Sequence, residues 1–166
     1  MENTADYKKQ AVLYGIIFGL FSSLLLYFDY KFQLEKTTIM SIVSFAIAIL
    51  LVLYPIHLFK LNNDNQLRIS QALKIGLIVG LIGGLIYALY TYFHYHQIDT
   101  EFVAKAIEEG NKALDQDGNL SQADLKRSKE MVSTLVSPFT FATFALIGAL
   151  LKTFLIALVV GLIKKS

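Results

Sequence analysis

Four long apolar runs limit what this chain of 166 residues can fold into. The runs cover residues 11–28, 39–59, 75–95 and 139–163, and each contains between 18 and 25 residues. At about 1.5 Å per residue, helices of these lengths extend about 27 to 38 Å, enough to cross the roughly 30 Å hydrocarbon core of a bilayer. Strands that cross membranes alternate apolar and polar residues, and these runs do not. The sequence therefore predicts four transmembrane helices.

The composition agrees with a membrane protein and excludes several other classes. Charged residues make up 17% of the chain, against roughly 25% in soluble domains. The absence of cysteine excludes thiol catalysis, cysteine zinc sites and iron–sulfur clusters. A net charge of +2 gives no bias toward nucleic acid, which we do not expect as a partner. There is no phosphate-binding loop, no nucleophile with a base and no paired-carboxylate site, so we expect neither enzymatic activity nor a cofactor.

The charges between the runs predict the orientation in the membrane. If both termini are cytoplasmic, that side carries seven basic and three acidic residues, and the opposite side carries seven basic and ten acidic residues. Basic residues close to the ends of the spans have the greatest influence, and five of the outer seven lie in the single polar segment 96–138. We therefore expect both termini in the cytoplasm.

Small residues recur along the predicted helices at a spacing that suits close packing. Gly76, Gly80 and Gly84 lie four residues apart and so share one ridge of the third helix. In lipid no hydrophobic force acts between helices, and close backbone contact drives much of their association. The ridge can join the third helix to the rest of the bundle, or it can join two copies of the chain. Similar ridges are formed by Gly15 and Gly19 and by Ala145, Ala149, Thr153, Ala157 and Gly161.

Three local signals set the ends of the second and third helices. Pro55 lacks a backbone donor, and we expect the second helix to bend or end near Tyr54. The polar residues 62–65 predict a turn. Leu67 and Ile69 indicate that the third helix begins before its apolar run.

The polar segment 96–138 has the pattern of a helical hairpin. Asp99 is suited to cap a first helix, and Ser121 with Asp124 forms the start of a second helix. The second helix has Leu125, Val132, Leu135 and Val136 near one stripe. We expect the two helices to bury their apolar stripes against each other, the bundle or the lipid headgroups.

Two polar clusters invite a comparison with metal sites, and both fail it. One resembles the oxygen donors of an EF-hand, which requires glycine at position 6 of twelve, where this chain has Leu120. The other pairs His94 with His96, whose side chains point about 200° apart on a helix. We therefore predict no metal. The residues compared are Asp115, Asp117, Asn119, Ser121 and Asp124 in the first cluster, and His94, His96 and Asp99 in the second.

Lys152 is the only formally charged residue within the four runs. A lysine at the centre of a transmembrane helix costs about 2.5 to 3.5 kcal/mol on insertion. Three interpretations are open. The amine snorkels or donates to carbonyls and hydroxyls of the bundle, it pairs with an acid from Asp29 or another subunit, or it belongs to a proton or substrate relay. Lys152 is therefore the candidate functional residue.

Several segments together resemble a known family of small bacterial membrane proteins that carry a domain of unknown function and are common in Bacteroidota-type genomes. The resemblance covers nearly the full length and implies a four-helix integral membrane protein with no assigned activity and no assigned site residues. It is found in Gly15 and Gly19 after a basic N-terminus, Lys74 with Gly76 and Gly80, Glu108-Glu109-Gly110, Leu146-Ile147-Gly148-Ala149, and Gly161 through Lys165.

These patterns predict an all-α polytopic integral membrane protein with one membrane domain over residues 1–166. It is a four-helix transmembrane bundle with an extramembrane helical hairpin between the third and fourth helices. We expect it in the bacterial inner membrane, in contact with the lipid bilayer, as a non-enzymatic structural or accessory subunit that presents the hairpin to a protein partner or forms a homo-oligomer. The alternative is a small transporter or channel component that uses Lys152.

Overall fold

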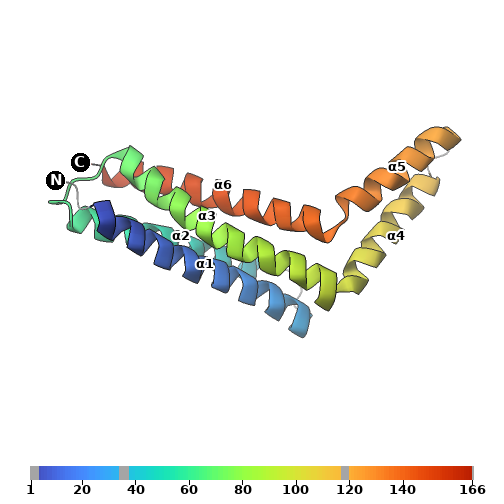
Figure 1. The fold of residues 1–166 in the computed structure, drawn as a ribbon, viewed down its shortest axis with the longest axis horizontal. Helices are drawn as coiled ribbons and strands as arrows, with labels where there is room; N and C mark the ends of the chain where they lie inside the picture. The colour runs from blue at the N-terminus through green and yellow to red at the C-terminus, as the bar shows by residue number, and fades with distance from the viewer. Residues whose placement is uncertain (1–3, 34–37, 117–119, 166) are drawn as a thin grey trace. The chain divides into compact units, whose positions relative to one another are not determined.

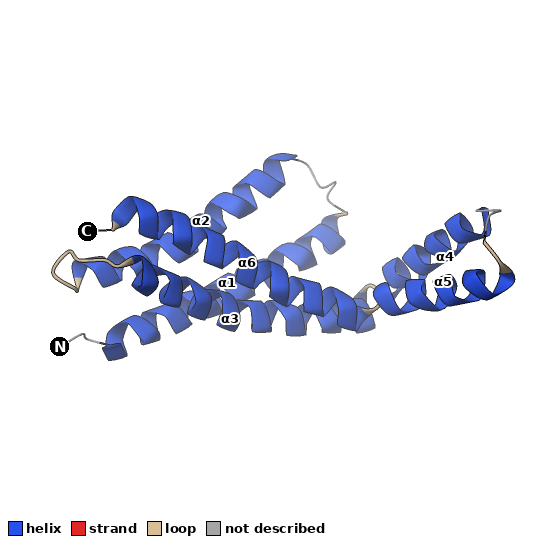
Figure 2. Ribbon diagram, turned by 90° about the horizontal axis from the view of Figure 1, so that it is seen from above, coloured by secondary structure: helices blue, strands red, loops and turns tan. Residues whose placement is uncertain are grey.

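The computed structural model describes residues 4–33, 38–116 and 120–165, and every regular element in these ranges is a helix (Figure 2). The prediction of an all-helical membrane protein is confirmed, because four of the helical segments are long and apolar enough to span a membrane. The elements are α1 Thr4–Phe32, α2 Thr38–Leu61, α3 Ile69–Phe93, the π-helix η1 His94–Ile98, α4 Thr100–Gln116, α5 Gln122–Leu135 and α6 Pro138–Lys164.

The chain divides into two compact units. The four-helix unit comprises Met1–Tyr87 and Ala145–Ser166, and the hairpin unit comprises Ala88–Phe144. In the four-helix unit, the beginning of α1 and the end of α6 lie at the same end (Figure 1). This placement is expected when four consecutive long helices run in alternating directions through one bundle.

The second helix does not stop at its proline. Pro55 lies inside α2, which continues to Leu61, so the expected end near Tyr54 is wrong. A proline removes one backbone donor, whereas ending a helix within lipid would leave several polar backbone groups unpaired, which is more costly.

The turn after α2 and the early start of α3 agree with the sequence-based expectations. Asp64 and Asn65 adopt left-handed φ angles of 50° and 59°, a conformation that short polar side chains tolerate. Leu67 is fully buried and α3 begins at Ile69. The connection therefore places α2 and α3 as consecutive neighbours.

One aromatic pair and one polar contact join neighbouring helices at an end of the four-helix unit. Tyr7 of α1 packs edge-on against Phe59 of α2, with ring centroids 5.5 Å apart. The Lys60 Nζ at the end of α2 donates a hydrogen bond of 2.8 Å to the Lys164 carbonyl oxygen at the end of α6. A cation is well placed there, because the last carbonyls of a helix lack partners and carry partial negative charge.

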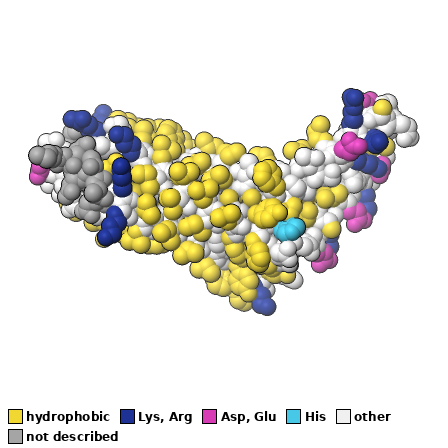
Figure 3. Space-filling view, viewed as in Figure 1, with side chains coloured by type: hydrophobic (Ala, Val, Ile, Leu, Met, Phe, Trp, Pro, Cys, Tyr) yellow, Lys and Arg dark blue, Asp and Glu magenta, His cyan; other side chains and the backbone are white. Residues whose placement is uncertain are grey.

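The outer surface of the four long helices is apolar (Figure 3). Each of the four helices exposes large apolar side chains, for example Leu20 of α1, Leu50 of α2, Leu81 of α3 and Leu155 of α6. Contiguous apolar surface on this scale is not stable in water and is suited to contact with lipid chains. Lysine and arginine side chains gather at the end of the four-helix unit where α1 begins (Figure 3).

The α3 ridge is filled by α6. A Cβ atom added at Gly76 would collide with the Cβ of Ala157, and one added at Gly80 would collide with the Oγ1 of Thr153. A Cβ at Gly84 would lie 3.1 Å from the Cβ of Ala149. The contacts are those of close helix packing within one chain, so this ridge is not available to join two copies.

A second close approach joins α3 to α1 on another face. A Cβ atom at Gly19 would lie 2.7 Å from the carbonyl oxygen of Gly83, and one at Gly83 would lie 2.6 Å from the carbonyl oxygen of Gly15. Helix α3 therefore packs between α1 and α6, with glycine at both contacts.

Replacing Gly80 with leucine should destabilise the bundle. The new side chain has no space beside Thr153, and overpacking of this kind typically costs about 1 to 3 kcal/mol. At about 2 kcal/mol we expect the unfolding temperature in detergent to fall by roughly 4 to 8 °C, measured by circular dichroism.

Gly148→Leu is the matched control, because no atom lies within 4 Å of a Cβ at Gly148. The control should unfold at the wild-type temperature. Equal unfolding temperatures for Gly80→Leu and Gly148→Leu would show that the α3–α6 contact is not as close as the structure has it.

Candidate functional site

Lys152 lies on the outer surface of the four-helix unit. Its side chain is exposed, whereas the adjacent Thr153 is fully buried against Gly80. Successive residues of a helix are about 100° apart, so the contact that buries Thr153 turns Lys152 outward. Transport along an interior path is not supported by this position, because the amine does not face the packed interior.

An open groove of about 290 Å³ surrounds Lys152 between α2 and α6. Apart from the lysine itself, its lining is entirely aliphatic or aromatic. The lining residues are Phe45 and Ile49 of α2 and Leu155, Ile156, Val159 and Val160 of α6.

The groove lies deep in the span. Lys152 is about 21 Å from the first residue of α6, Pro138, and about 18 Å from the last, Lys164, at about 1.5 Å per residue. With a hydrocarbon core of roughly 30 Å centred on α6, Lys152 is about 13 to 17 Å from the two interfaces, farther than its four-carbon stem reaches, so the amine does not snorkel to either interface.

The amine of Lys152 makes no hydrogen bond or ion pair with the residues that the structure describes. The neighbouring hydroxyl of Thr153 is committed elsewhere, since it donates to the carbonyl oxygens of Ala149 and Leu150 at 3.0 and 3.2 Å. The expectation that the lysine donates to carbonyls and hydroxyls of the bundle is therefore not met within these residues.

The hairpin unit contains the second candidate surface, formed by α4 and α5. Gly110 allows the helices to approach, because a Cβ there would lie 2.9 Å from the Cγ1 of Val132. The Nζ of Lys129 lies 2.6 Å from the Oδ1 of Asp115, which joins the end of α4 to the middle of α5. The two helices of the predicted hairpin therefore contact each other between Gly110 and Asp115 of α4 and between Lys129 and Val132 of α5.

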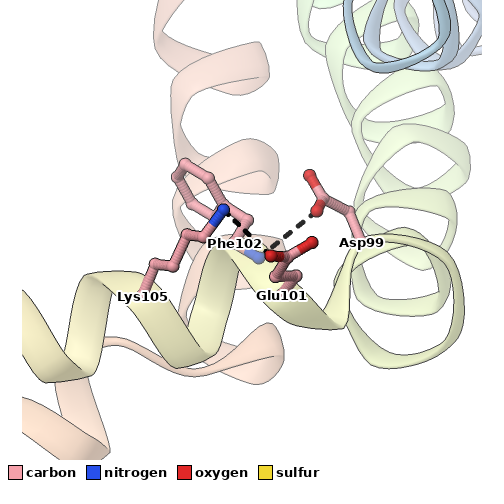
Figure 4. Close-up of polar contacts among 4 residues, drawn as sticks. All are labelled: Asp99, Glu101, Phe102 and Lys105. Carbon is pink, nitrogen blue, oxygen red and sulfur yellow. Dashed lines mark hydrogen bonds and ion pairs between the residues drawn. The ribbon is translucent and has the colours of Figure 1, made fainter.

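Both predicted caps of the hairpin are confirmed. The Oδ1 of Asp99 accepts a hydrogen bond of 3.3 Å from the backbone N–H of Phe102 (Figure 4). The Oγ of Ser121 accepts from the backbone N–H of Asp124 at 3.2 Å and donates to its carboxylate at 2.6 Å. Such caps satisfy orphan donors in the first turn and stabilise a helix by about 1 kcal/mol.

Three aromatic rings pack together where η1, α4 and α6 meet within the hairpin unit. The centroid of Tyr95 lies 4.9 Å from that of Phe141 and 5.3 Å from that of Phe102. The contact joins residues 46 positions apart and so closes the base of the hairpin. The sequence pattern did not identify these partners.

The outer face of α4 carries two ion pairs, each between residues that are one turn apart. Lys105 pairs with Glu101 at 2.9 Å (Figure 4), and Lys112 pairs with Glu108 at 2.6 Å. The hydrogen bond from Lys112 lowers the pKa of Glu108, and the hydrogen bond to Glu101 raises the pKa of Lys105. The contribution of Glu108 to helix stability is present above the ordinary pKa of glutamate and is lost as the pH falls through the lowered pKa. These side chains are fully exposed, so the face is stabilised only weakly and stays hydrated.

Two large apolar side chains interrupt the polar surface of α5. Met131 is 61% exposed and Leu135, one turn later, is 54% exposed. Leu135 was expected near one stripe with Leu125 and Val132, and the other helix of the hairpin does not bury it. It lies about 80° around the helix from Leu125, at the edge of the stripe, where α4 does not cover it.

The two histidines that follow α3 do not converge on one point. His94 is buried and its Nδ1 lies 3.4 Å from the Oη of Tyr90, whereas His96 is exposed and stacks on Tyr92. Among the described residues no group of three His, Cys, Asp or Glu is placed to hold a metal. Asp117 and Asn119 of the EF-hand comparison lie outside the described residues.

Replacing Gly110 with leucine should open the hairpin. The side chain would displace Val132, and at about 1 kcal/mol or more the opened hairpin becomes at least about fivefold more populated. We expect trypsin to cleave after Lys126 or Arg127 at least about fivefold faster, followed by mass spectrometry.

Ala113→Leu is the matched control for this experiment, since Ala113 is exposed on the same helix. Its cleavage rate should equal that of the wild type. If both variants are cleaved at the wild-type rate, α4 and α5 do not depend on the contact at Gly110.

Residues 13–166 match the family model described as "Protein of unknown function (DUF4199)". Neither the curated proteins nor the solved structures compared with the chain gave a match. The family description assigns no activity, so any function must be argued from the surfaces described above. The chain belongs to the DUF4199 family.

Proposed function

We propose that this member of the DUF4199 family is a non-enzymatic accessory subunit of the bacterial inner membrane that presents its α4–α5 hairpin to a protein partner. The observation that supports this function best is the exposed pair Met131 and Leu135 on the otherwise polar surface of α5.

The hairpin has internal contacts of its own. Its helices are capped at Asp99 and Ser121, packed at Gly110 and joined by the ion pair of Lys129 with Asp115. Two neighbouring large apolar side chains left outside such a packed pair are typical of a contact surface for another protein. Methionine suits this role, because its unbranched side chain adapts to different partner surfaces.

The charge distribution supports an orientation with the hairpin outside the cytoplasm. Four spans return the chain to the side on which it began, and the beginning of α1 lies at the same end as the end of α6 (Figure 1). That end carries the lysines Lys8, Lys9, Lys60 and Lys164 close to the ends of the spans. Lysine and arginine near the ends of spans favour the cytoplasmic side.

Replacing Met131 and Leu135 together with serine should remove the partner and leave the hairpin folded. Burying two such side chains contributes about 1.5 to 3 kcal/mol each, so we expect at least about a tenfold loss of the co-purified protein. The measurement is affinity purification of the tagged chain in mild detergent, with quantitative mass spectrometry of the proteins that it retains.

The control replaces Glu108 and Lys112 with glutamine, which changes the charged face of α4 alone. This variant should retain the partner. Proteins retained in equal amounts by the wild type and by the serine variant would contradict the proposed contact surface.

The absence of cysteine allows the orientation to be tested by single-cysteine labelling. Ser133→Cys places a thiol on the exposed surface of α5, and Lys165→Cys places one after α6. We expect a membrane-impermeant maleimide to label Ser133→Cys in intact spheroplasts and to label Lys165→Cys only after lysis. The reverse pattern would place both termini outside.

A further inference from the structure

We propose that the groove between α2 and α6 binds a transmembrane helix of another protein, and that this helix carries an aspartate or glutamate at the depth of Lys152. The proposal concerns the lipid-facing surface of the four-helix unit and does not depend on the hairpin.

The position of Lys152 is maintained by the packing of α6. Thr153 and Ala157 are held against Gly80 and Gly76 of α3, so α6 cannot rotate to bring the lysine inside without breaking these contacts. The bundle therefore holds a cation permanently on its lipid-facing side. Charged residues in transmembrane segments ordinarily pair or face a hydrated cavity, and neither arrangement is present around Lys152 in the described residues.

The shape of the surface suits a helix. Leu155 and Val159 follow Lys152 at three and seven positions along α6, which places them on the same face. Phe45 and Ile49, four residues apart on α2, form the opposite wall. A groove with apolar walls and one amine between them is complementary to an apolar helix that carries one carboxylate.

The required acid cannot come from a lipid. Headgroup phosphates and carboxylates lie at the membrane interface, and Lys152 is about 18 to 21 Å from the ends of α6. An anion at the depth of the amine must be carried by a protein side chain that is itself within the membrane.

A second copy of this chain cannot supply the acid either. Among the described residues, the four candidate spans contain one acid, Asp29, which lies three residues before the end of α1 and not at the depth of Lys152. None of the four apolar runs, residues 11–28, 39–59, 75–95 and 139–163, contains aspartate or glutamate. The glycine ridges of α3 are also filled by α1 and α6, so they offer no further contact for a second copy. Charge complementarity therefore selects a different membrane protein.

The test uses model transmembrane peptides as the probe. The full chain carries a donor dye at Lys165→Cys and is reconstituted in phosphatidylcholine vesicles at pH 8. Acceptor-labelled leucine–alanine peptides of about 21 residues carry glutamate, glutamine or leucine at their centre. We expect the glutamate peptide to associate about tenfold more tightly than the leucine peptide, by energy transfer.

Three variants identify the site. Lys152→Met should reduce the affinity for the glutamate peptide to that for the leucine peptide. Val159→Trp should fill the groove and weaken binding, and Leu81→Trp, on an exposed position of α3, should not. The variant with serine at positions 131 and 135 should bind as the wild type does, which separates this proposal from the function proposed for the hairpin.

Several results would overturn the proposal. Equal binding of the glutamate and leucine peptides, or unchanged binding to Lys152→Met, would show that the amine recognises no acid. Energy transfer between two copies of the chain that is lost in Lys152→Met would identify a second copy as the occupant. Competition by anionic phospholipid would assign the amine to lipid headgroups.

Discussion

The close approach of α3 to its two neighbours is the contact on which the rest of the molecule depends. In lipid the helices gain little from hiding apolar side chains, so contact between backbones must supply the packing. Glycine provides it on two faces of α3, with Gly83 against α1 and with Gly76 and Gly80 against α6. The rotation and depth of the outer helices are set by these contacts.

One consequence is that the two candidate surfaces have different physical origins. Lys152 is directed outward because Thr153, on the other side of α6, is held by Gly80. Met131 is exposed because it lies about 120° around α5 from Leu125, away from the face that contacts α4. The first surface is recognisable by an uncompensated charge in an apolar medium, and the second by apolar side chains in a polar one.

Most of the fold was predictable because its determinants are local. The four spans follow from the length and apolarity of their segments, and the caps at Asp99 and Ser121 follow from side chains that reach their own backbone within three residues. The features that escaped prediction depend on tertiary contacts or on the medium. These are the π-helix at His94–Ile98, the exposure of Leu135 and the direction of Lys152.

The hydrogen bond between Lys60 and the end of α6 can form only after the last residues of α6 have been synthesised. The third helix ends at Phe93 and α6 ends at Lys164, so about 70 residues are still to be made when α3 is complete. At about 5 to 20 residues per second, the α3 ridge waits several seconds for the helix that fills it. During that interval its glycines are open to any neighbouring small-residue helix, and the contact at Lys60 forms only when the last turn of the chain has arrived.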